Sequence, residues 1–126
     1  MAVKNYSFPT ALPNLQTQAT VITWASMANS DTGTPFPIDD YFENVLAYVN
    51  GTFGAGGNLR WEGSVDGGTT WVTLNDDTGA ALNMTAVGFK VVKEKPLLIR
   101  PNATAGDGTT ALIPVLVLRR VMSNNR

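Results

Sequence analysis

The chain of 126 residues contains no histidine and no cysteine. Without cysteine it can form neither a disulfide nor a thiolate metal site. Without histidine it lacks the commonest general base and the commonest ligand of transition metals. No apolar run approaches the roughly 20 residues of a membrane-spanning helix, and the first residues do not follow the charged-then-apolar plan of a signal peptide. These absences predict a protein made in a cytoplasm that binds no metal and no membrane.

Charged side chains are also scarce, at 15% of the chain, where about 25% is usual for a globular domain. Much of the surface should therefore be neutral, polar or covered by a partner. The few charges are unevenly placed, because residues 1–89 hold eight acids and two bases while residues 90–126 hold seven bases and two acids. This asymmetry either supports contacts between copies or with a partner, or it cancels where strands bring distant segments together.

The most specific pattern is Ser64–Trp71, which fits Ser-x-Asp-x-Gly-x-Thr-Trp, the Asp box of β-hairpins. Before it, Asn58–Val65 alternates between an apolar and a polar face, which predicts a strand with one buried side. The expected buried side consists of Leu59, Trp61, Gly63 and Val65. After the turn, Trp71–Leu74 is rich in residues that favour strands. The segment therefore predicts a β-hairpin.

The turn of this hairpin has residues suited to a tight reversal. We expect Ser64 and Asp66 to fasten it by side-chain hydrogen bonds, and glycines such as Gly68 to supply positive φ angles. Trp71 is expected to pack into the core beneath the turn. The similar run Ala105–Thr110 predicts a second turn of the same chemistry.

Alternating or short apolar segments predict further strands at Ala19–Ser26, Asp39–Asn50, Ala81–Met84, Gly88–Lys93, Leu97–Ala103 and Ala111–Val121. Asp39–Asn50 is apolar on both faces, as in a strand between two layers, with a short helix over Asp39–Val45 as the alternative. Asn29–Pro37 is rich in turn residues and predicts a loop. Pro114 cannot donate a hydrogen bond, so its position should be an edge or a bulge.

About eight strands at this spacing predict an all-β fold, an antiparallel β-sandwich or jelly roll. The length is that of one domain, which we assign to residues 19–126. Residues 1–18 show no period and contain two prolines, which predicts an extended N-terminal arm. Its apolar side chains, too many for an idle tail, are Tyr6, Phe8, Leu12 and Leu15. They should pack either on the domain's own sheet or on a neighbouring subunit.

The residue types that carry catalysis are missing or isolated. A Ser-His-Asp or Cys-His set cannot be built. The adjacent carboxylates at Asp39-Asp40 and Asp76-Asp77 would point to opposite faces of a strand, and aspartate is favoured at such turns. The glycine-rich run Gly51–Gly57 is not followed by the helix and Lys-Ser/Thr of a phosphate-binding loop. We therefore predict no enzyme activity, no cofactor and no metal site.

Other side chains are more typical of packing or of protein contacts. The three tryptophans could stack on sugars, but Trp61 shares a face with Leu59 and Val65, and core packing is the simpler interpretation. Basic side chains are concentrated near the end of the chain, at Lys90, Lys93, Lys95, Arg119 and Arg120. Because the chain as a whole is slightly acidic, they do not predict a nucleic-acid partner. With the apolar side chains of the arm, they are candidates for a protein interface.

Several segments occur in a characteristic order along residues 45–120. They are Val49–Phe53, Gly63–Trp71, Asp77–Ala81, Ile99–Pro101, Ala105–Thr110 and Val115–Arg119. Together they make the chain similar to small virion proteins of tailed bacteriophages, above all capsid decoration (cement) proteins.

This resemblance implies a β-sandwich or jelly roll on the capsid surface of a virion. Its partners would be the major capsid protein, whose assembled lattice it stabilises, and further copies of itself, commonly in a homotrimer. Two other functions are open. One is a carbohydrate-binding adhesin module of a head fibre or tail, which would expose aromatic side chains to a glycan. The other is a head–tail connector or tail structural component.

Overall fold

The computed structural model of the protein describes residues 1–7, 19–38 and 42–120, and of Ala19, Phe42 and Arg120 only the backbone. The expected arm residues Phe8, Leu12 and Leu15 lie outside the described residues, as does the start of the segment for which a helix was the alternative. From Phe42 onward that segment is a β-strand.

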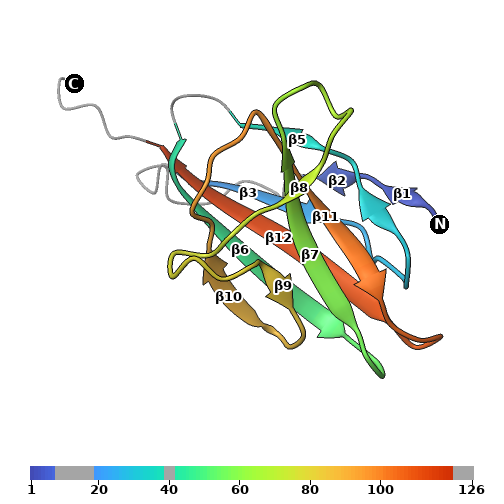
Figure 1. The fold of residues 1–126 in the computed structure, drawn as a ribbon. Helices are drawn as coiled ribbons and strands as arrows, with labels where there is room; N and C mark the ends of the chain where they lie inside the picture. The colour runs from blue at the N-terminus through green and yellow to red at the C-terminus, as the bar shows by residue number, and fades with distance from the viewer. Residues whose placement is uncertain (8–18, 39–41, 121–126) are drawn as a thin grey trace, which may run out of the picture.

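Two mostly antiparallel sheets make up the described fold, which confirms the predicted all-β sandwich. Sheet A contains β1 (Val3–Lys4), β4 (Thr32–Gly33), β5 (Phe36–Pro37), β7 (Asn58–Ser64), β8 (Val72–Thr73), β9 (Asn83–Met84) and β11 (Leu98–Ala105). Sheet B contains β2 (Tyr6–Ser7), β3 (Ala19–Trp24), β6 (Phe42–Thr52), β10 (Gly88–Val91) and β12 (Ala111–Arg120). Figure 1 shows the long strands of the two sheets crossing as stacked layers, the arrangement of a sandwich.

The order of strands is β1-β4-β11-β7-β8 in sheet A and β10-β6-β12-β3-β2 in sheet B. In sheet A, β5 also pairs with β11, and β9 pairs with β7. The segment predicted as a loop over Asn29–Pro37 therefore contains two short strands, β4 and β5. Their two-residue length and turn-rich sequence hide them in the sequence, because both form by pairing with β11 and β4 pairs with β1 as well.

The core lies between the sheets and is built from the inward side chains of both. Trp24 of β3 and Trp61 of β7 meet edge to face there, with ring centroids 5.7 Å apart. The Trp24 Nε1–H donates to the Thr34 carbonyl oxygen over 2.9 Å. Both rings are fully buried, so core packing is the role of these two tryptophans.

The first seven residues form part of the domain. β1 pairs in parallel with β4 of sheet A, and β2 pairs with β3 of sheet B. The Tyr6 ring packs edge to face against Trp24 and Phe36, at 5.6 and 5.4 Å. The buried Asp31 accepts hydrogen bonds from the backbone N–H of Ala2 and of Ala28, both over 2.9 Å. Of the two sites considered for the arm, its first part occupies the domain's own sheets.

Pro114 lies in β12, a central strand, at a bulge of the neighbouring β3. Val115 pairs with Thr23, and the next bridge joins Leu112 to Met27. Between these two bridges, residues 24–26 on the β3 side lie opposite only residues 113 and 114 of β12. The Leu112 N–H donates to Met27, and since successive N–H groups alternate in direction, position 114 faces the same irregular side. A missing N–H is tolerated there, as expected for a bulge.

Candidate functional site

The Asp-box turn connects β7 to β8, and these two strands pair as a hairpin. The Ser64 hydroxyl donates to Asp66 Oδ1 over 2.8 Å and accepts from the Gly68 N–H over 3.0 Å. Asp66 Oδ1 also accepts from the N–H groups of Thr69 and Thr70, over 3.1 and 2.9 Å. Gly68 has a φ of 95°, which a residue with a Cβ rarely adopts. The turn is thus held by its own side chains.

These hydrogen bonds fix the charge of the turn. The backbone N–H of Thr70, followed by the Ser64 hydroxyl, lowers the pKa of Asp66 from 3.8 to about 2. In the second turn the Thr109 hydroxyl and the Ala55 N–H lower the pKa of Asp107 to about 2 as well. Both carboxylates are therefore ionised near neutral pH, and each serves as an acceptor for its loop.

Trp71 does not pack into the core as expected. It is half-buried on the outer side of sheet A, where the Arg100 guanidinium stacks over its ring with 4.2 Å between Cζ and the ring centroid. Arg100 in turn donates through Nε to Oε1 of the buried Glu62 over 2.9 Å. The alternation along β7 predicted that Glu62 would be exposed to solvent. Instead Arg100 and Asn102 of β11 cover Glu62, since Asn102 donates to it as well.

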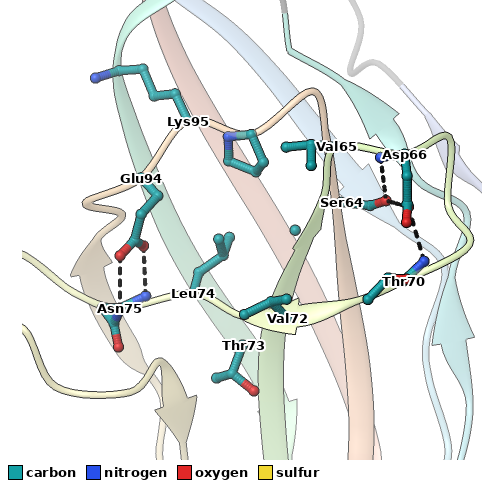
Figure 2. A pocket seen from close by; sticks show the side chains of 12 residues that line it. Ser64, Val65, Asp66, Thr70, Val72, Thr73, Leu74, Asn75, Glu94 and Lys95 are labelled. Atoms are coloured by element: carbon teal, nitrogen blue, oxygen red, sulfur yellow. Dashed lines mark hydrogen bonds between the residues drawn. The ribbon is translucent and has the colours of Figure 1, made fainter.

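Beside the turn, the end of β7 borders a pocket of about 490 Å³, shown in Figure 2. Its walls are the Asp-box turn, β8 and the segment 94–96. The floor depends on Gly63, because a Cβ there would clash with Pro96 Cγ and lie 2.8 Å from Leu74 Cδ2. A glycine in this strand therefore lets the segment 94–96 close over β7.

The polar groups of the pocket wall are largely engaged within the chain. Glu94 accepts from the backbone N–H and the side-chain amide of Asn75, each over 2.8 Å (Figure 2). Burial would raise the pKa of Glu94, but the two hydrogen bonds from Asn75, a hydrogen bond from its own backbone and the charge of Lys93 together lower the pKa. Asp66 is engaged in the turn. What remains open to a partner is mainly apolar, with Lys95 at the rim.

Apolar side chains surround this pocket and are unusually exposed. Val65 lies beyond the end of β7 and is 71% exposed, so its predicted place in the core is wrong. Val72 is 63% exposed on β8, and Leu97, next to the pocket residue Pro96, is 59% exposed. We call the surface formed by Val65, Val72, Pro96 and Leu97 the Asp-box corner.

A second apolar surface covers the outer side of sheet B. One row across the strands joins Phe89, Tyr48, Val115 and Thr23 in register. The next row joins Val91, Leu46, Val117 and Val21. We call these eight residues the B face.

Alternation along each strand directs the B face away from the core, because the intervening residues of β6 and β12 are buried. Phe89 is 63% and Val91 42% exposed, and the rest are half-buried. The Phe89 ring stacks on Tyr48 at 4.7 Å. The predicted two-sided apolar strand is therefore correct for β6, but within the described residues only one of its sides is covered by a second sheet.

The outer side of sheet A is polar by contrast. Besides Glu62 and Arg100 it contains Asn58, whose amide donates to Thr104 over 2.6 Å and to Asn83 over 3.2 Å. The two outer sides of the sandwich thus differ in chemistry, one hydrogen-bonded and hydrophilic, the other apolar.

The basic candidates lie in separate places. Lys90 of β10 is in register with the buried Ala47, so it points to the inner side of an edge strand while remaining exposed. Lys93 is exposed just after β10, and Lys95 borders the pocket. Arg119 is exposed at one end of the B face, in register with Asn44. The backbone of Arg120 pairs with Phe42. Of the four candidates whose side chains are described, Lys95 borders the pocket and Arg119 lies at the end of the B face, so these four do not form one basic site.

Sequence reasoning missed the B face as a surface and the corner as a pocket. The signals were present, in the apolar outer positions of β12 and in valines at 65 and 72 beside a turn. In the described part of the chain, no group of three or more acidic side chains is arranged to hold a metal ion. No helix in that part is long and apolar enough to cross a membrane. Comparison with protein-family models, curated proteins and solved structures found no match to this chain.

Proposed function

We propose that this protein is a structural virion subunit of the capsid decoration type, which attaches to the assembled lattice of the major capsid protein and stabilises the head without catalysis. The observation that carries the proposal is the presence of two separate apolar surfaces, the Asp-box corner and the B face, on one small domain. Exposed apolar patches next to polar residues are typical of sites that contact other proteins. A subunit with two such surfaces is suited to two different neighbours.

The finer description of the fold belongs to the same proposal. The resemblance to decoration proteins implies a jelly-roll path for the strands and assembly of the protein with copies of itself. The extended arm expected over residues 1–18 rests instead on the prolines and apolar side chains of that segment. Beyond residues 1–7, which pair with the domain's own sheets, its apolar side chains would add to the contacts with a neighbouring subunit.

The Asp-box corner is the surface that we assign to the lattice. Its turn is held rigid by five hydrogen bonds that involve Ser64 or Asp66, so docking would cost little ordering of the loop. Val65, Val72 and Pro96 line a pocket that can accept an apolar side chain of the capsid protein, and the exposed Leu97 follows Pro96 in the chain. A ligand that binds only the assembled state stabilises that state by mass action.

Co-sedimentation with heads assembled from the major capsid protein of the same genome tests this assignment. Val72→Glu places a charge at the corner and is expected to weaken attachment at least tenfold. Val3→Glu makes the same change at an exposed valine of β1 and should attach like the unchanged protein. Equal attachment of all three proteins would exclude the corner as the contact. Failure of the unchanged protein to attach would contradict the proposed function itself.

The carbohydrate-binding alternative has one observation in its favour. Trp71 is half-exposed on the hydrophilic side of sheet A under Arg100, and Arg100 and Asn102 both donate to Glu62. An aromatic ring near hydrogen-bonding groups is suited to stack on a sugar. Binding of a glycan there would change the tryptophan fluorescence, and Trp71→Phe would remove most of that change, because both other tryptophans are buried. A panel of sugars without effect would reject this function.

A head–tail connector or tail component would present the same surfaces to other virion proteins. Copy number separates it from a decoration protein, since connectors form single small rings while decoration proteins follow the number of capsid subunits.

A further inference from the structure

The B face extends over four neighbouring strands, β10, β6, β12 and β3, and two side-chain rows. With strands about 4.8 Å apart and residues about 3.3 Å apart, it covers on the order of 200 to 300 Å² before its rim is counted. Within its two rows no side chain is charged. One end is polar, with Asn44 and Arg119 in register, and the row at the other end joins Asn50 to the half-buried Ile113. An apolar centre with a rim that contains polar side chains is typical of a protein interface.

The edges of sheet B are unsuited to strand addition. At one edge, β10 carries Lys90 pointing to the inner side, and an inward charge on an edge strand opposes pairing with another strand. At the other edge, β2 has only two residues. A partner is therefore expected to pack on the B face rather than to extend the sheet.

The residues of the B face grade from large to small across the sheet. The half on β10 and β6 contains Phe89, Tyr48 and Leu46, and the half on β12 and β3 contains valines and Thr23. A two-fold axis parallel to the strands, between β6 and β12, would place the large half of one copy against the small half of the other. Phe89 would then face Thr23 of the second copy, and Tyr48 would face Val115.

The same operation is compatible with the rim, because Arg119 of β12 would face Asn44 of the second copy, which lies in the same row. An axis perpendicular to the strands would instead place β10 against β10 and β6 against β6, so that the large halves of the two copies would meet each other. Size therefore favours the axis along the strands.

We propose that two copies of this chain pair face to face through the B face, about a two-fold axis along the strands between β6 and β12. Sheets packed in this way lie about 10 Å apart. Rotation about an axis along the strands keeps their ends on one side, so both Asp-box corners project from the same end of the pair. If the corner binds the lattice, as the proposed function states, each pair attaches through two sites and gains avidity. Only this last consequence rests on the proposed function.

Light scattering on the full-length protein, resolved by size-exclusion chromatography, tests the pairing. The unchanged protein is expected to have the mass of two copies. Val115→Glu, at the centre of the face, should have the mass of one copy. Phe89→Glu should have the same mass, and it is less expected to disturb folding because Phe89 is exposed on an edge strand. Val3→Glu and Val72→Glu should remain paired. A mass of one copy, a mass of three copies as in the trimer that the resemblance implies, or pairing that survives Phe89→Glu would overturn the proposal.

Cross-linking tests the direction of the axis. Because the chain contains no cysteine, an introduced cysteine is the only thiol that the reagent can modify. Cysteine can be introduced by Thr23→Cys and, in a second variant, by Phe89→Cys. These two positions lie in one row, three inter-strand spacings or roughly 14 Å apart within a chain. With a short bismaleimide reagent, a mixture of the two variants should give cross-linked pairs, while each variant alone should give few. Strong product from Phe89→Cys alone, or none from the mixture, would contradict this axis.

The outcomes also separate the two proposals. A single-copy protein that attaches to heads through Val72 would overturn the pairing and leave the decoration role standing. A paired protein that does not attach would overturn the decoration role alone.

Discussion

At the scale of single residues, short polar side chains determine how the turns are held. Asp66 and Asp107 are each followed by glycine and then by threonines, and both accept backbone N–H groups of their own turns. The type of residue and its spacing were enough to expect this for Ser64 and Asp66. The contact of Asp107 with Ala55 could not be expected, because it joins loops 52 residues apart in the chain.

The pH dependence of folding follows from these turns. The pKa of Asp66 is about 2 in the folded protein against an ordinary value of 3.8, and Asp107 behaves alike. A lowered folded pKa contributes stability that is complete above the unfolded pKa and is lost as the pH falls through the folded one. Urea unfolding should therefore show constant stability from pH 7 to about 5, and a decline between about 4 and 2. Asp66→Asn should be less stable at pH 7 and decline less steeply, and an unchanged slope would contradict this role.

Two tryptophans of one hairpin should differ in their contribution to stability. Trp61 is fully buried, and Trp61→Ala is expected to cost about 3–5 kcal/mol. Trp71 is half-buried under Arg100, and Trp71→Ala should cost only about 1–2 kcal/mol. Urea unfolding of the two variants measures the difference. Equal losses would mean that Trp71 contributes to the core after all.

At the scale of elements, the long strands were predictable and the short ones were not. Alternation and length marked β6, β7, β11 and β12, which form the centres of the two sheets. β4 and β5 have two residues each and exist because β11 provides a partner. Pro114 was expected at an edge or a bulge, and the bulge beside β12 explains how a proline occupies a central strand.

The edge strand β10 makes a testable prediction about assembly. Lys90 points inward from this edge, where its charge opposes the addition of another strand. Lys90→Val should therefore increase association beyond the pair, seen as larger particles in dynamic light scattering. Lys93→Val, which removes an exposed lysine outside β10, is the matched control. Identical particle sizes for both variants would show that Lys90 does not protect the edge.

At the scale of the whole molecule, the sandwich separates a hydrophilic outer side from an apolar one. The uneven charge of the sequence is partly mixed by the fold, since Arg100 of the basic segment pairs with Glu62 of the acidic one. The sequence showed that β6 is apolar on both faces, but it could not show whether the second face is covered by its own chain or by another molecule. That distinction depends on which strands come to lie over it in space.

Quantitative mass spectrometry of purified virions tests the proposal that this domain is a structural part of an assembled particle. Virions produced from the genome that encodes the chain should contain it in numbers comparable with the major capsid protein. They should lose it when Val72→Glu is introduced and retain it with Val3→Glu. Virions that contain none of the chain, or only the few copies of a single ring, would contradict the decoration role.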